Sequence, residues 1–222
     1  MQNQINAMKK LLFILLLSAS AFKATAQDDL YIQAMQPAVA MLDTATAYGT
    51  YQQLSNQFER IAGAAQKEWL PYYYAALCNT VSSFMVTGKN KKNLDDVLDK
   101  SQVWIDKADS MMPNNSEIYA VKGMILQARI MVNPMSRGKK YGMMATGLLE
   151  KSKELNKTNP RPYYLEAQGT FYTPKMFGGG KERAKPMAEE AVAKFADFKP
   201  DASIAPHWGA DKAKKLVDEC SN

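Results

Sequence analysis

The feature that most constrains the fold is a set of tyrosines and small residues that recur along the chain at nearly constant intervals. Tyr72, Tyr119 and Tyr163 are 47 and 44 residues apart. A second series of small or apolar residues, spaced by 47, 44 and 39 residues, consists of Leu54, Ser101, Ala145 and Ala184. Two series that stay in register over three or four copies indicate stacked repeats of one supersecondary unit, because periods of 20 to 50 residues are typical of solenoids and related arrays.

The stretch 101–128 predicts that each unit is built from two antiparallel helices. Pro113 lacks an N–H and restricts the residue before it, so it ends the first helix at about residue 112. Ser116 can cap the next helix, with Asn115 as the alternative. Gly123 is small enough to allow close approach of a neighbouring helix. The expected unit is therefore helix, turn, helix.

Hydrophobic periodicity extends this organisation over the rest of the chain. Helices are predicted over 28–44, 51–65, 72–86, 94–112, 117–132, 141–155, from about 163, from about 184 to 195, and over 208–220. Polar or glycine-rich turns are predicted at 87–93, 133–140 and 173–180, and a proline-bracketed linker at 200–206. Strand-like alternation of useful length is absent from the sequence, so the predicted class is all-α.

These motifs resemble the tetratricopeptide (TPR) repeat family, in particular small exported bacterial TPR proteins. The segments that carry the resemblance are WLPYYYA at 69–75, NNSEIYA at 114–120, NPRPYYL at 159–165 and FGGGKERA at 177–184. The resemblance implies a right-handed α-solenoid over 27–222, with about four TPR-like helix pairs followed by a C-terminal helix. It also implies a scaffold without catalytic activity or cofactor. The chain departs from the family in its period, which exceeds about 34 residues, and at Lys157, where a turn proline is usual.

Residues 1–26 have the pattern of a secretory signal peptide. Lys9 and Lys10 precede an apolar run over 11–21, and Ala24-Thr25-Ala26 supplies small residues for cleavage. The run is shorter than the roughly 20 residues that span a bilayer. We therefore expect an exported, periplasmic protein that begins at Gln27 and has no transmembrane anchor after cleavage.

Charge argues against nucleic acid as a partner. The net charge is +6 for the whole chain, but residues 1–26 hold three lysines and no acidic residue, which leaves about +3. A nucleic-acid-binding domain is expected to be much more basic on one face.

The two cysteines, Cys78 and Cys220, are compatible with a disulfide in an oxidising compartment. In a solenoid each repeat contacts only its neighbours, and about two repeats separate these thiols. Free thiols are the expected state.

The A helices of TPR scaffolds line the concave face, which makes that face one candidate for partner binding. Counting from the three recurring tyrosines places a set of apolar and amide side chains there: Tyr73, Leu77, Met124, Gln127, Tyr164, Gln168 and Phe171. Tyrosine combines apolar bulk with a hydroxyl and suits recognition surfaces. The alternative is that these residues pack between helices.

A basic edge is the second candidate. Cations gather in the three predicted turns between A and B helices: Lys89, Lys91 and Lys92, then Arg137, Lys139 and Lys140, then Lys181 and Arg183. If the helices are assigned correctly, all of them project from one edge of the solenoid. The alternative is that they complement the dipoles of the A helices at their C-terminal ends.

Motifs for catalysis or metal binding are weak. Gly178-Gly179-Gly180-Lys181 lacks the preceding strand and the following Ser or Thr of a phosphate loop, so a turn with positive φ is expected. His207 is the only histidine, and no cysteine cluster or nucleophile motif accompanies it. We predict no catalytic residues, no metal site and no cofactor.

The sequence thus favours a non-enzymatic scaffold in the cell envelope that mediates protein–protein interaction. The alternative is a periplasmic small-ligand-binding component associated with a transporter. A largely apolar pocket of several hundred Å³ would favour the alternative, and an open groove would favour the scaffold.

Overall fold

The computed structural model describes residues 29–86 and 93–222, and within these ranges it contains helices and no strand. The helices are 29–44, α2 (Tyr48–Ala64), α3 (Trp69–Ser83), α4 (Leu94–Met111), α5 (Ser116–Ile130), α6 (Pro134–Leu155), α7 (Arg161–Tyr172), α8 (Lys181–Asp197) and α9 (Ala210–Ser221), with a short 3-10 helix, η2 (Lys175–Phe177). The predicted all-α class is confirmed. None of the helices in these ranges is both long and apolar enough to cross a membrane.

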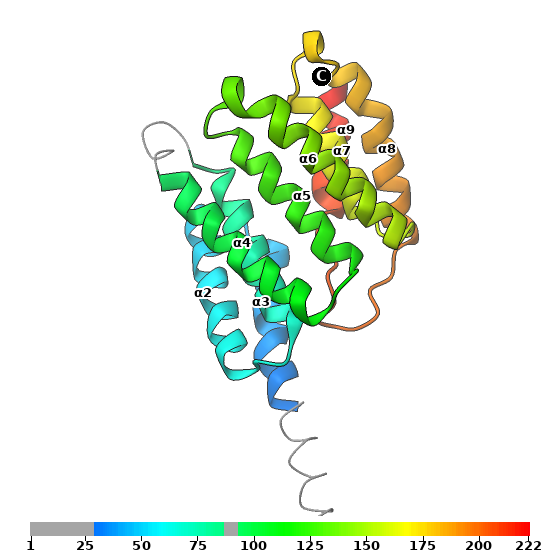
Figure 1. Ribbon diagram of the computed structural model, residues 1–222. Helices are drawn as coiled ribbons and strands as arrows, with labels where there is room; N and C mark the ends of the chain where they lie inside the picture. Colours follow the sequence, from blue (N-terminus) through cyan, green and yellow to red (C-terminus); the bar gives the residue numbers. More distant parts are fainter. Residues whose placement is uncertain (1–28, 87–92) are drawn as a thin grey trace, which may run out of the picture.

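The helices stack in sequence as antiparallel pairs (Figure 1). Helix 29–44 precedes α2, and α3 with α4, α5 with α6 and α7 with α8 form the next three pairs. The first helices of successive pairs, α3, α5 and α7, contact one another and form an inner row. α9 closes the C-terminal end by packing on α8 and touching α7.

The recurring small residues occupy the contacts between helices, as predicted. Leu54, Ser101, Ala145 and Ala184 are all buried. Gly123 lies so close to α6 that a Cβ placed on it would be 2.8 Å from Leu149 Cδ2. The helix pairs therefore interlock through small residues that face bulky ones.

Helix boundaries agree with the sequence at some ends and differ at others. α4 ends at Met111 before Pro113, and the cap of α5 is Asn115, whose side chain accepts from the amide of Glu117 at 2.8 Å. The predicted turn over 133–140 is wrong, because α6 already begins at Pro134. Asn133 caps that helix, and proline is favourable in a first turn, where its missing N–H has no helical partner.

The segment 198–209, which we call the crossover segment, connects α8 to α9 and runs back to the first repeat (Figure 1). Tyr74 of α3 donates to the carbonyl of Ile204 at 2.9 Å, and Gln36 donates to Ser203 at 3.1 Å. The prediction of a plain linker here is incomplete, because contacts between residues about 130 to 170 positions apart join the two ends of the solenoid. Trp208 belongs to this segment and not to α9, because the helix begins only at Ala210, after the N-cap residue Gly209 with its φ of 112°.

Candidate ligand-binding cleft

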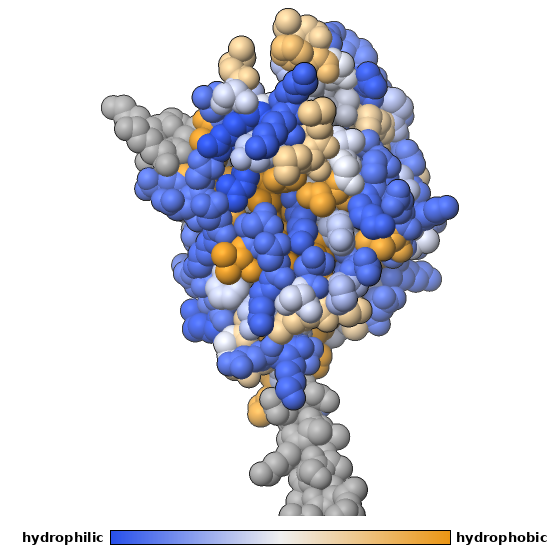
Figure 2. Space-filling view, in the orientation of Figure 1, coloured by the Kyte–Doolittle hydropathy of each residue, from blue (hydrophilic) through white to orange (hydrophobic). Residues whose placement is uncertain are grey.

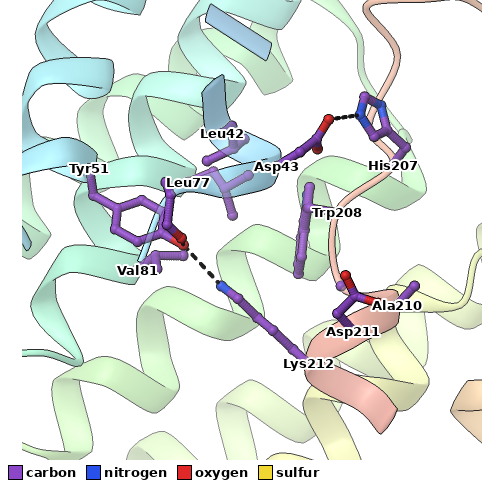
Figure 3. A pocket seen from close by; sticks show the side chains of 12 residues that line it. Leu42, Asp43, Tyr51, Leu77, Val81, His207, Trp208, Ala210, Asp211 and Lys212 are labelled. Carbon is purple, nitrogen blue, oxygen red and sulfur yellow. Dashed lines mark hydrogen bonds and ion pairs between the residues drawn. The ribbon is translucent and has the colours of Figure 1, made fainter. Parts of the chain in front are cut away.

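A cleft of about 270 Å³ lies where the crossover segment meets the first repeat (Figure 3). We call it the cleft. Its lining comes from the end of helix 29–44 and the residue that follows it, from α2, from α3, from the crossover segment and from the start of α9: Leu42, Asp43, Ala45, Tyr51, Leu77, Val81, His207, Trp208, Gly209, Ala210, Asp211 and Lys212. The cleft therefore exists only because the C-terminal segment folds back onto the N-terminal helices.

One side of the cleft is apolar. Leu77 and Val81 stand one turn apart on α3, so both project from the same face of that helix. Leu42 lies beside them, and the indole of Trp208 faces the same space from the crossover segment (Figure 3). Such walls suit a flat apolar ligand, because burying apolar surface is favourable in rough proportion to its area.

A buried polar chain holds Trp208 in place. Its indole Nε1 donates to the hydroxyl of Tyr73 at 2.8 Å, and that hydroxyl donates to Glu117 at 3.0 Å. Arg161, whose side chain is fully buried, pairs with Glu117 at 2.8 Å and also donates to the carbonyl of Pro206. Helices α3, α5 and α7 thus fix the crossover segment through one network.

The environment of this network affects the ionisation of its members. Burial raises the pKa of Glu117 above its usual range, and the Arg161 guanidinium opposes that rise. Burial also raises the pKa of the Tyr73 phenol well above its ordinary value, so the phenol stays protonated and can donate. Arg161 lies 5.5 Å from the ring centroid of Trp208 and 4.7 Å from that of Phe198, close enough for cation–π attraction.

His207 links the crossover segment to helix 29–44. Its Nε2 is 3.0 Å from Asp43 Oδ2, and its Nδ1 is 2.8 Å from the carbonyl oxygen of Ala205. Both neighbours are hydrogen-bond acceptors, one a carboxylate and the other a backbone carbonyl. The bond to Asp43 connects the two sides of the cleft (Figure 3).

Lys212 enters the cleft from α9. Its ammonium lies 3.5 Å from the Tyr51 hydroxyl and 5.5 Å from the centroid of the Tyr51 ring. The Tyr51 hydroxyl itself donates to the carbonyl of Ala45 at 2.8 Å. Lys212 is an exposed residue overall, and partial burial lowers the pKa of its amine. Burial likewise raises the pKa of the Tyr51 phenol.

The seven residues predicted on the concave face do not form one open surface. Tyr73, Leu77, Met124 and Tyr164 are buried, and Gln127, Gln168 and Phe171 are partly buried. The amides are used internally, since Gln127 donates to the Leu165 carbonyl at 2.8 Å and Gln168 donates to the Tyr164 hydroxyl at 2.9 Å. Of the seven, Leu77 alone is part of the cleft lining.

The predicted basic edge is placed only in part. Lys89, Lys91 and Lys92 lie outside the described residues. Lys139 and Lys140 are exposed in the second turn of α6, and Lys181 and Arg183 are exposed in the first turn of α8. The starts of these two helices lie at the same end of the molecule in Figure 1. Arg137 is not a free cation, because it makes two hydrogen bonds to Asp95, at 2.7 and 2.8 Å.

The glycine run before α8 is a turn, as expected. Gly178 and Gly180 have φ values of 84° and 105°. The amides of Gly178, Gly179 and Gly180 all donate to backbone carbonyls, so none of the three is free to hold a phosphate. Across 29–86 and 93–222, no three potential metal-ligating side chains from His, Cys, Asp and Glu gather in one place.

Sequence reasoning missed the polar side of the cleft. Asp43 and Tyr51 lie about 160 residues before His207 and Lys212, and a repeat pattern shows only contacts between neighbouring repeats. The signal that was available is the sequence Pro206-His207-Trp208, where two amphipathic aromatic side chains stand outside the repeat register.

Comparison with known proteins gives one informative match. The fold is similar to that of the HusA haemophore from Porphyromonas gingivalis, with a TM-score of 0.76 and 35% sequence identity over 86% of this chain and 92% of that chain. The sequence matches no protein-family model and no curated protein.

This match corrects the predicted function. The prediction of a protein-interaction scaffold is wrong, because the similar protein is a haemophore. The geometry gives the physical reason: the predicted concave face is largely packed between helices, whereas a partly apolar cleft is present elsewhere. Both findings favour the alternative, binding of a small ligand.

Proposed function

This protein belongs to the family of the HusA haemophore, and on that premise we propose that it is a binding protein for haem or a closely related tetrapyrrole. The observation that carries the proposal is the cleft between the N-terminal helices and the crossover segment. It is lined by the indole of Trp208, by Leu77 and Val81 of α3, and by several polar groups. A ligand site of this kind is typically concave and mostly apolar, with a few placed polar groups.

The lining residues fit a tetrapyrrole chemically. The flat ring would lie against Trp208 and cover Leu77 and Val81 of α3, since aromatic rings stack favourably in offset arrangements. His207 and Tyr51 have the side-chain types that ligate haem iron in proteins. Each is already hydrogen-bonded, His207 to Asp43 and Tyr51 to Ala45, so ligation by either would replace an existing bond.

The size of the cleft means that a tetrapyrrole would not be fully enclosed. Its volume of about 270 Å³ is just below the roughly 300–1,000 Å³ of typical ligand pockets. Two exposed apolar side chains are close in sequence to the lining: Tyr48, one turn before Tyr51 on α2, and Met85, in the turn that follows α3. We propose that the outer part of the ring rests on such side chains outside the cleft.

We infer further that the protein acts by binding and release and not by catalysis, and that it works after export, with 1–26 as its signal peptide. Residues 1–26 lie outside the described residues, so their sequence pattern alone supports this part. The TPR-like nature of the helix pairs also belongs to the proposal, supported by the buried recurring positions 54, 101, 145 and 184.

The test is a titration of the purified protein with haem, followed by the Soret absorbance and by quenching of tryptophan fluorescence. The expected result is saturation at one haem per chain. Trp208→Ala should weaken binding by roughly thirtyfold or more, because buried aromatic anchors typically contribute about 2 kcal/mol or more.

Phe177→Ala is the matched control, since Phe177 is 68% exposed in η2 and is not part of the cleft lining. It should bind haem like the wild type. Absence of saturable binding, or equal losses in Trp208→Ala and Phe177→Ala, would refute the proposed site.

A further inference from the structure

The cleft contains the ammonium group of Lys212, and no carboxylate of the described residues forms an ion pair with it. Lys212 reaches into it from α9, and its ammonium lies closest to the neutral hydroxyl of Tyr51, at 3.5 Å (Figure 3). Among the residues that the structure describes, no carboxylate lies within ion-pair distance of Lys212.

The carboxylates around it have other partners. Asp43 is 3.0 Å from His207, and Asp211 is 3.7 Å from Lys214. Asp43 and Asp211 are the acidic residues in the cleft lining. The Lys212 ammonium therefore lies in the cleft without an ion pair to either of these two carboxylates.

An unpaired ammonium in a hollow is costly, because part of its hydration is lost without compensation. The lowered pKa of Lys212 has burial as its main cause and agrees with this geometry. A carboxylate on the ligand would remove the cost by forming a charge-assisted hydrogen bond, which is shorter and stronger than a neutral one.

Resting on the proposed function, we propose that Lys212 recognises a carboxylate carried by the ligand and makes the cleft selective for acidic tetrapyrroles over their uncharged derivatives. The ring would stack on Trp208, and a propionate at its edge would accept a hydrogen bond from the Lys212 ammonium. Tyr51 cannot supply this donor while its hydroxyl donates to Ala45, so the selectivity falls to Lys212.

The experiment compares protoporphyrin IX with its dimethyl ester, which has the same ring without the two carboxylates. Binding of each is measured by tryptophan quenching for the wild type, Lys212→Met, Lys212→Arg and Lys215→Met. Lys215 lies on the same helix, is 76% exposed and pairs with Glu219, so Lys215→Met is the matched control for loss of one positive charge.

The wild type should prefer the free acid by roughly tenfold to a hundredfold, as expected for one hydrogen bond to a charged group. Lys212→Met should lose this preference while its affinity for the ester is unchanged. Lys212→Arg should retain much of the preference, and Lys215→Met should behave as the wild type.

Two results would overturn the inference while leaving the proposed function intact. One is equal binding of acid and ester by the wild type, a measurement that needs no variant. The other is an undiminished preference in Lys212→Met. If neither porphyrin binds the wild type, the proposed function itself fails, and the inference fails with it.

Discussion

The buried pair of Arg161 and Glu117 offers a sharp test of how the crossover segment is held. We predict that Arg161→Met lowers the free energy of unfolding by about 3–5 kcal/mol, because removal of one partner leaves a buried charge uncompensated. Arg161 is fully buried, and methionine fills much of its volume, so the loss arises mainly from the unpaired Glu117 carboxylate and the unbound Pro206 carbonyl. For a chain of this size the melting temperature should fall by roughly 6–20 °C.

The loss should depend on pH in a defined direction. Without Arg161, burial raises the pKa of Glu117 in the folded state above its unfolded value. Such a carboxyl favours folding below its unfolded pKa, and this contribution is lost as pH rises through the folded pKa. Arg161→Met should therefore be less damaging at pH 5 than at pH 7.

Urea unfolding followed by far-UV circular dichroism at both pH values measures this effect. Lys175→Met is the control, because its ion pair with Glu182 is exposed on both sides, and no measurable change is expected. A loss below about 1 kcal/mol for Arg161→Met, or a loss that grows at low pH, would refute the argument that this network is dry and tightly paired.

Three further predictions follow from the same structure. Gly123→Leu should destabilise the protein by about 2 kcal/mol or more in urea unfolding, since a side chain there meets α6; Gly147→Ala, which has open space around its Cβ, should be neutral or slightly stabilising, and equal effects would contradict the packing. Arg137→Met should lower the free energy of unfolding by up to about 1 kcal/mol at pH 7 and should have no effect once Asp95 is protonated. The hydrogen bond from Arg137 lowers the pKa of Asp95, so the pair stabilises the fold above the unfolded-state pKa of Asp95, and this stabilisation is lost as pH falls through its folded-state pKa. A loss of stability that does not change with pH in thermal melts would contradict this. N-terminal sequencing of the protein from its native envelope should begin at Gln27, and an intact leader would refute export.

The sequence was sufficient to predict the helix pairs, because their contacts are local and repeat. The burial of Leu54 and Ala184 and the close approach at Gly123 follow from a pattern visible in the sequence. The start of α6 was missed because Pro134 and Gly138 in a polar stretch suggested a turn, whereas Asn133 caps the helix and Pro134 occupies its first position.

The cleft could not be predicted in the same way, because it depends on contacts between the two ends of the chain. Nothing in the neighbourhood of His207 indicates Asp43 as its partner, and nothing near Lys212 indicates Tyr51. Those pairings arise only when Arg161 and Tyr74 anchor the crossover segment on the inner row of helices. The predicted concave face of apolar and amide side chains is instead largely packed between helices, where Gln127 and Gln168 make internal hydrogen bonds.

Apolar side chains are also exposed outside the cleft. Figure 2 shows that the face over α4, α5 and α6 is largely hydrophilic, with apolar side chains in separate patches. The largest exposed apolar side chains near α7 and η2 are Tyr172, Met176 and Phe177, with 71%, 82% and 68% of their surface open. They offer exposed apolar surface away from the cleft lining.

A crystal structure of the protein in complex with haem tests most directly the claim that the cleft is the binding site. The account predicts density for the macrocycle against Trp208, between α3 and the start of α9, with a carboxylate within hydrogen-bond distance of Lys212. Haem bound instead on Tyr172, Met176 and Phe177, with the cleft unchanged, would contradict it.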